Sequence, residues 1–188
     1  MRLLRAILPG AMMLAVASCG YNTIQTYDEQ VNAAGSQIKV QLQRRADLIP
    51  NLVETVKGYA RHEEGIFVEV ANARARLAGA VQSGDLRQMA DANAALTAPL
   101  GRLLAIAENY PLLKANENFR TLQDQLEGTE NRIAVARQDY NEAVNRYNAY
   151  IRRFPQVLTA KVIGKTARTY FEVTTPGADT VPRVNFTK

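Results

Sequence analysis

The sequence predicts an all-α protein, an elongated antiparallel bundle of three to four long helices followed by a short extended C-terminal tail. After the first twenty residues, apolar residues recur at intervals of three, four and seven, which is the spacing of one face of a helix. Strong helix breaks occur at only a few points, so the helices between them are long. Such helices bury their apolar stripes against one another, and a bundle follows.

The N-terminus is predicted to carry a signal peptide at residues 1–18. Two arginines precede about a dozen apolar residues, and the stretch ends in Val16-Ala17-Ser18-Cys19, which is similar to a lipobox. Residues 19–22 would form the lipid-anchored N-terminus, with a fatty acid such as palmitate on the Cys19 thiol. A spanning helix needs about 20 apolar residues, more than this run offers. An uncleaved anchor and a plain secreted protein are the alternatives.

Composition limits the remaining possibilities. The chain has 188 residues, 47% of them apolar, which suits one domain with one core. Its single cysteine excludes a disulfide within the chain. The net charge of +5 comes from basic residues spread along the sequence rather than clustered beside aromatic residues. This distribution argues against nucleic acid as a partner.

The first helical segment is expected over residues 23–80. Pro50 lies inside it, and an internal proline removes a backbone donor. We therefore expect either a kink near residues 48–49 or two helices that meet at Pro50. Arg45 and Glu63 interrupt the apolar stripe, which otherwise consists of Ile38, Leu42, Ile49, Leu52, Val56, Tyr59, Ile66, Val70, Ala73 and Leu77.

The second helix is expected over residues 86–109. Gly84 favours a break before it, and Asp85 with Gln88 resembles a capping box. Pro99 lies within this helix. Tyr110-Pro111 ends it, since a residue that precedes proline disfavours the helical conformation.

The third helix is expected over residues 112–154, where apolar residues alternate steps of three and four as in a coiled-coil seam. The seam consists of Leu112, Ala115, Phe119, Leu122, Leu126, Thr129, Ile133, Ala136, Tyr140, Ala143, Tyr147, Tyr150 and Phe154. Pro155 stops this helix, and a short fourth helix follows at residues 159–168. Residues 169–188 form the tail, which is extended or flexible and includes β-like runs at 169–173 and 184–186.

Four polar residues surround Pro50 and form the candidate interaction site: Arg45, Asp47, Asn51 and Glu54. A charge that faces a core needs a partner, because burial without one is costly. Glu130, Arg137, Asp139 and Asn141 on the third helix are the candidate partners. The group is either a buried polar clamp that sets helix register or a patch that binds another protein.

Candidate catalytic groups are few. His62 is the only histidine, and with Glu54 and Glu63 it could form a metal site. The sequence has neither a second histidine for a zinc motif nor a glycine-rich phosphate loop. It also lacks the nucleophile elbow of a serine hydrolase. We therefore expect neither an enzyme nor a bound metal or cofactor.

Several stretches resemble the LemA family when they are taken together. The most specific is RRADLIPNLVETVKGY at residues 44–59, and the others are ENYPLLKAN at 108–116, FRTLQ at 119–123, TENRI at 129–133 and RQDYN at 137–141. The resemblance implies a membrane-tethered, extracytoplasmic helical bundle over residues 23–168. Family members commonly carry an N-terminal transmembrane helix, and here the lipobox-like Cys19 takes its place.

The resemblance and the residues together predict a structural or protein-interaction role in the bacterial cell envelope. The chain would be held on the membrane through Cys19 and would bind an envelope protein or a second copy of itself. Gly20 is not the aspartate that acts as an inner-membrane retention signal in some bacteria, so the outer membrane facing the periplasm is favoured over the inner membrane. The alternative is an envelope enzyme or metal-dependent factor that uses His62 with nearby carboxylates.

Overall fold

The computed structural model describes residues 2–172, with side chains from residue 20 onwards. The described chain is helical with connecting turns and contains no strand, and its long helices pack antiparallel, which confirms the predicted fold class. The described residues fall into two compact units. Unit 1 comprises residues 2–41 and 127–171, and unit 2 comprises residues 42–126 and 172. The side chain of Cys19 and residues 173–188 lie outside the described part, so the predicted run at 184–186 does too.

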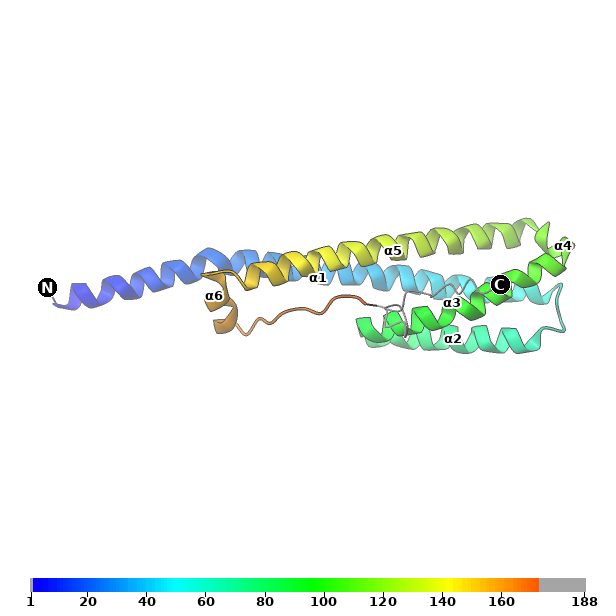
Figure 1. Cartoon of the computed structure of the whole chain (residues 1–188), viewed down its shortest axis with the longest axis horizontal. Helices are drawn as coiled ribbons and strands as arrows, with labels where there is room; N and C mark the ends of the chain where they lie inside the picture. The colour runs from blue at the N-terminus through cyan, green and yellow to red at the C-terminus, as the bar shows by residue number, and fades with distance from the viewer. Residues whose placement is uncertain (1, 173–188) are drawn as a thin grey trace, which may run out of the picture. The chain divides into compact units, whose positions relative to one another are not determined.

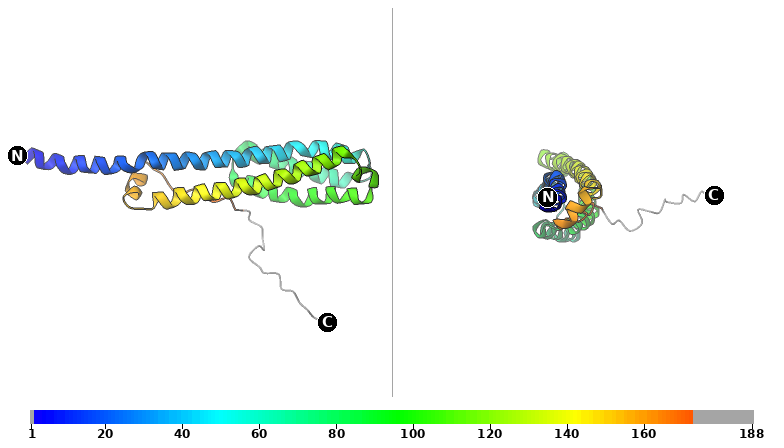
Figure 2. Two further views of the ribbon diagram at one scale, coloured as in Figure 1. Left: turned by 90° about the horizontal axis from the view of Figure 1, so that it is seen from above. Right: turned by 90° about the vertical axis from the view of Figure 1, so that its left-hand side faces the viewer.

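Unit 1 is built on two antiparallel helices, α1 (Arg2–Lys57) and α5 (Glu117–Ile151), in the parts of them that belong to this unit (Figure 1). The short helix α6 (Gln156–Val162) follows α5 and runs across the two long helices, as both Figure 1 and Figure 2 show. Its apolar core contains Ile24, Val31, Ile38, Ile133, Tyr140, Val144 and Tyr147. The seam predicted for the third helix therefore is the buried face of α5 in this unit.

Unit 2 contains the end of α1, then α2 (Glu64–Ser83), α3 (Leu86–Asn109), the single turn α4 (Pro111–Lys114) and the start of α5. Helices α2 and α3 form an antiparallel hairpin (Figure 1). Its turn confirms the predicted signals. Gly84 adopts a left-handed φ of 75°, and the Asp85 carboxylate accepts from the amides of Arg87 and Gln88 at 2.8 and 3.1 Å.

The prediction of two helices that meet at Pro50 is wrong, because α1 continues through it to Lys57. Pro50 has no amide hydrogen for the Ala46 carbonyl, one turn earlier. Arg74 of α2 replaces that donor, with its Nε at 3.1 Å from the Ala46 oxygen. A side chain from another helix thus satisfies the acceptor that proline leaves open.

The real interruption of residues 23–80 lies at residues 58–63. Gly58 is a poor helix former, and the amides of Tyr59 and Ala60 both return to the Val56 carbonyl to close the last turn of α1. Tyr59, predicted in the stripe, is exposed, and Ala60 is buried in its place. Glu63 is exposed in this turn and so does not interrupt a buried stripe.

The predicted third helix is also shorter than expected at both ends. Asn116 breaks it, since its side-chain oxygen accepts from the Phe119 amide at 3.0 Å and caps α5. Leu112 is therefore exposed on α4, where Leu113 is buried instead. At the other end α5 stops at Ile151, and Phe154 is exposed.

The fourth helix covers residues 156–162 rather than 159–168. Gly164 ends it at a left-handed φ of 70°, and the Lys165 amide donates to the Ala160 carbonyl at 2.9 Å, as in a Schellman motif. Residues 165–172 have no regular secondary structure, which fits an extended tail but not a strand at 169–172. We call residues 165–171 the strap, because they run back along α5.

Candidate functional site

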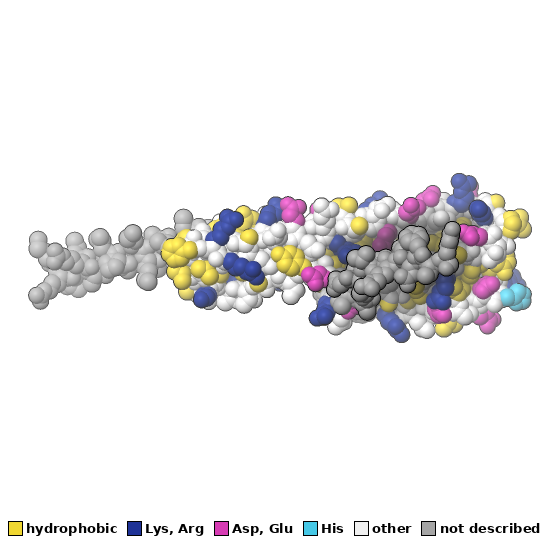
Figure 3. Space-filling model, in the orientation of Figure 1, with side chains coloured by type: hydrophobic (Ala, Val, Ile, Leu, Met, Phe, Trp, Pro, Cys, Tyr) yellow, Lys and Arg dark blue, Asp and Glu magenta, His cyan; other side chains and the backbone are white. Residues whose placement is uncertain are grey.

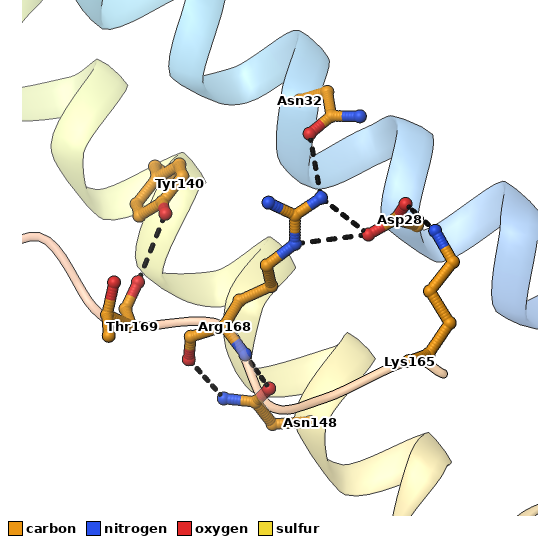
Figure 4. Close-up of polar contacts among 7 residues, drawn as sticks. All are labelled: Asp28, Asn32, Tyr140, Asn148, Lys165, Arg168 and Thr169. Carbon is orange, nitrogen blue, oxygen red and sulfur yellow. Dashed lines mark hydrogen bonds and ion pairs between the residues drawn. The ribbon is translucent and has the colours of Figure 1, made fainter. Parts of the chain in front are cut away.

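The most elaborate polar site that the structure describes joins the strap to the two long helices of unit 1 (Figure 4). Its centre is Asp28 of α1, a carboxylate that is only 6% exposed. Lys165 donates to its Oδ2 at 2.6 Å, and Arg168 donates to its Oδ1 from Nε at 3.1 Å and from Nη2 at 2.8 Å. Asn32, one turn further along α1, accepts a second bond from Arg168 Nη2 at 3.1 Å.

The two cations decide the charge state of Asp28. Burial alone would raise the pKa of this carboxyl, but hydrogen bonds and charges from Lys165 and Arg168 outweigh it and hold the pKa below the usual 3.8. The hydrogen bonds from Arg168 to Asp28 in turn raise the pKa of the guanidinium. At neutral pH the site is therefore one carboxylate between two cations.

Two asparagines of α5 bind the strap through its backbone. The Asn148 side chain accepts from the Arg168 amide and donates to the Arg168 carbonyl, both at 2.8 Å. The Asn141 side chain does the same with Phe171, at 2.8 and 3.2 Å. Each side-chain amide thus supplies the donor and acceptor that a neighbouring strand would supply.

The spacing of these asparagines fits an extended peptide. Asn141 and Asn148 are seven residues apart, which is about 10.5 Å along a helix. Arg168 and Phe171 are three residues apart, which is about 10 Å along an extended chain. The pairing is antiparallel, because the later asparagine binds the earlier strap residue. Two turns of helix therefore match three extended residues.

Two further contacts complete the site. The Tyr140 hydroxyl donates to the Thr169 carbonyl at 3.0 Å, and burial raises the pKa of Tyr140, so the phenol keeps its proton at neutral pH. The Phe171 ring is buried, and the Arg137 guanidinium carbon lies 5.2 Å from its centroid, in cation–π contact.

The arrangement is suited to holding a peptide rather than to catalysis. The asparagines contact backbone atoms and therefore accept any sequence, whereas Asp28 selects a basic side chain at the position of Arg168. Sequence analysis named Arg137 and Asn141 only as partners for the group around Pro50 and did not identify this site. The recognisable signal was a pair of asparagines seven residues apart beside a buried helix face.

The residues predicted around Pro50 lie in unit 2 and do not share one environment. Arg45 is buried and donates from Nη1 to the side-chain oxygen of Asn93 in α3, a residue that is itself buried. Asp47, Asn51 and Glu54 are exposed. Gln43 donates to Asp47 at 2.8 Å and Lys57 to Glu54 at 2.9 Å, both along α1.

Because Arg45 is buried and the other three residues are exposed, the two interpretations apply to different members of the group. The clamp interpretation applies to Arg45, with Asn93 as the partner that sequence analysis missed. The patch interpretation applies to the three exposed residues. Pairing of Arg45 with Glu130 or Asp139, which belong to the other unit, stays a prediction.

His62 is exposed in the turn between α1 and α2, next to the exposed Glu63 and Glu64. Among the side chains that the structure describes, no three histidine, cysteine, aspartate or glutamate residues group closely enough to hold a metal ion. Nothing in this geometry gives His62 the ligand set that the metal hypothesis needs.

These observations define a class of protein: an all-helical protein in which long antiparallel helices hold an extended C-terminal strap. Comparison with known families identifies the family: residues 34–186 match the LemA family, and the chain belongs to it. The matched region contains the strap and both asparagines but not Asp28 or Asn32.

The chain is also similar to three magnetosome proteins. MamQ 2 and MamQ 1 of Paramagnetospirillum magneticum (strain AMB-1) are each 27% identical over 198 residues, which covers 93% of this chain and 72% of theirs. MamQ of Magnetospirillum gryphiswaldense (strain MSR-1) is 27% identical over 183 residues, which covers 85% of this chain and 67% of its own. In the described residues no helix is long and apolar enough to cross a bilayer.

Proposed function

We propose that this LemA family member is a lipoprotein of the bacterial cell envelope, anchored through Cys19 on the extracytoplasmic side, with a structural or protein-binding role. The outer membrane, with the protein facing the periplasm, is its proposed location. The proposal includes no catalytic step and no cofactor. Its binding partner would be an envelope protein or a second copy of the chain.

The observation that supports the anchor is close packing directly after Cys19. Gly20, the residue after Cys19, is buried, and a Cβ built on it would lie 3.2 Å from Cγ of Gln156 in α6. Close packing against α6 is therefore present one residue after the proposed attachment point. Cleavage before Cys19 would remove residues 1–18 and leave this packing intact.

The anchor is tested by labelled palmitate in cells that express the full chain. Wild type should incorporate the label and migrate as a processed protein. Cys19→Ala should incorporate none and remain a precursor that retains residues 1–18. Ser36→Ala, an exposed change on α1, is the control and should behave as wild type. Absence of label from wild type would contradict the lipoprotein proposal.

The binding role is supported by three polar side chains on one stretch of α1, because Asp47, Asn51 and Glu54 are exposed to solvent. Their exposure means that alanine at all three should leave the fold intact. Crosslinking in intact membranes, followed by purification of the chain, should then lose the partner recovered with wild type.

The matched control replaces Glu117, Asn118 and Asp124 of α5, which are the same three residue types, also exposed in unit 2. This control should keep the partner. Equal recovery from both triple variants would show that the residues near Pro50 are not the binding surface.

A further inference from the structure

One end of unit 1 exposes a row of large apolar side chains. Phe154 is 81% exposed, Leu158 is 53% exposed and Val162 is 87% exposed. Leu158 and Val162 are four residues apart and share one face of α6, and Phe154, which precedes this helix, completes the row in sequence. Thr159 and Ala160, on the other side of α6, are buried. Contiguous apolar surface of this kind marks an interaction site.

The same end is basic. Residues 143–168 contain six lysines and arginines and no aspartate or glutamate. Lys165 and Arg168 bind Asp28, and Arg146 forms an ion pair with Glu142 at 3.3 Å. The other three, Arg152, Arg153 and Lys161, are exposed around the apolar row. Figure 3 shows hydrophobic and basic side chains together at the end of the described surface that holds α6.

This patch lies beside the proposed attachment point. Gly20 approaches Gln156 of α6 and the Tyr150 hydroxyl, and Tyr150 packs edge-to-face on Tyr27 with centroids 5.2 Å apart. Cys19 is one peptide unit from Gly20, or about 3.8 Å between Cα atoms. An acyl chain on Cys19 would therefore bring α6 to the bilayer surface. Because α6 runs across α1, it would lie along that surface rather than point into it (Figure 2).

We propose that Phe154, Leu158 and Val162, with Arg152, Arg153 and Lys161, form a docking surface for anionic phospholipid; we call it the α6 patch. The apolar row enters the interfacial region, and the three cations bind headgroup phosphates. The inference rests on the proposed anchor at Cys19. The acyl chain would hold the protein on the membrane, and the α6 patch would fix the orientation of unit 1.

The absence of tryptophan from the sequence permits a direct test. Phe154→Trp introduces the only tryptophan of the chain at an exposed aromatic position. Val135→Trp, at a position on α5 that is 59% exposed, is the control in the same unit. It lies sixteen residues before the end of α5, or about 24 Å along the helix. Each mature protein is reconstituted in phosphatidylcholine vesicles with and without phosphatidylglycerol.

With phosphatidylglycerol present, the Phe154→Trp protein should emit at shorter wavelength and lose most of its emission to lipids brominated near the headgroup end of the acyl chain. The Val135→Trp protein should show neither change. Adding Arg152→Glu and Arg153→Glu to Phe154→Trp should abolish the effect. Adding Lys39→Glu and Arg132→Glu, an equal charge change at exposed sites in unit 1, should preserve it. Equal emission from the two tryptophan variants would overturn the α6 patch.

Vesicle flotation separates this inference from the anchor. Protein that floats but leaves the tryptophan at position 154 unquenched retains the anchor and refutes the patch. If Cys19 reacts with a thiol reagent, it carries no acyl chain and the anchor is refuted. Quenching of the Phe154→Trp variant in that same protein would still support the α6 patch. Protein that fails to float on anionic vesicles refutes both.

Discussion

In unit 1 the polar contacts join helices to an extended segment, whereas in unit 2 they join one helix to another. Among the described residues, the strap makes one hydrogen bond to another backbone, from the Lys165 amide to α6, and its other buried backbone groups need partners. Asn141 and Asn148 supply them, and Asp28 adds charge. In unit 2 the helices satisfy their own backbones. There, Arg74 bonds the carbonyl that Pro50 leaves without a donor, and Arg45 donates to the buried Asn93.

The two units should therefore respond to different changes. Unit 2 depends on apolar volume. Unit 1 depends in addition on a buried carboxylate and two side-chain amides, so charge and hydrogen bonding should affect it most.

The largest effect is expected from the core of unit 2. Leu103 of α3 is fully buried, and Leu103→Ala should lower the free energy of unfolding by about 2–5 kcal/mol through lost burial and the cavity left behind. Urea denaturation measures it. Gln138→Ala, an exposed change on α5, should stay within about 0.5 kcal/mol. Similar losses from the two variants would contradict the assigned core.

Asp28→Asn should cost about 2–3 kcal/mol at neutral pH, less than the loss of a fully buried pair because Arg168 is 41% exposed. The effect should depend on pH in a defined direction. The folded-state pKa of Asp28 is lowered, so its stabilisation is complete above the unfolded value near 3.8 and is lost as the pH falls through the folded value.

Thermal melting of wild type and Asp28→Asn from neutral to acidic pH tests this sign. The difference in melting temperature should be constant above about pH 5 and should shrink below about pH 4. A difference that is unchanged in acid would show that the Asp28 charge does not stabilise the strap.

In unit 2, Arg45→Met should cost about 1–3 kcal/mol, because it leaves the buried Asn93 oxygen without its donor. Arg45→Met combined with Asn93→Leu removes both polar groups and should be less destabilising than Arg45→Met alone. Chemical denaturation measures the free energy of unfolding of both variants. If the double variant has a lower free energy of unfolding than Arg45→Met alone, Asn93 stabilises the core without Arg45.

The smallest effect concerns the hydrogen bond from Arg74 to the Ala46 carbonyl, which Pro50 leaves without an amide donor. Arg74→Ala should cost about 1 kcal/mol in wild type, the net worth of one hydrogen bond. In a Pro50→Ala background the new amide can serve the Ala46 carbonyl, and Arg74→Ala should then cost almost nothing. A double-mutant cycle measures this coupling. Equal costs in both backgrounds would contradict the role given to Arg74.

Helix α3 was predictable from the sequence to the residue because its limits depend on local chemistry. Gly84, Asp85 and Pro111 act through their own backbones or through neighbours two or three residues away. Periodicity likewise identified most of the buried face of α5 from Phe119 to Tyr147, although Leu122 is only half-buried and the buried Val144 was not in the predicted seam. Where the determinant is a short-range steric or hydrogen-bonding preference, sequence analysis found it.

The errors share a different cause. A kink or a break was expected at Pro50. The helix is not broken there, and Arg74, which no local pattern reveals, bonds the carbonyl that proline leaves without a donor. The strap depends on Asp28 and Arg168, which are 140 residues apart in the chain. Arg45 was recognised as buried, but Asn93 was not recognised as its partner. Pairings between distant residues are set by tertiary packing, and a single sequence gives no direct signal for them.

Two asparagine side chains hold the strap on α5, and amide hydrogen exchange can measure this directly. The amides of Arg168 and Phe171 lie outside any helix, yet each donates to an asparagine oxygen. Both should exchange as slowly as amides within α5. In Asn148→Ala the Arg168 amide should lose this protection, and in Asn141→Ala the Phe171 amide should lose it. Exchange of both amides in wild type at the rate of an unstructured peptide would contradict the account.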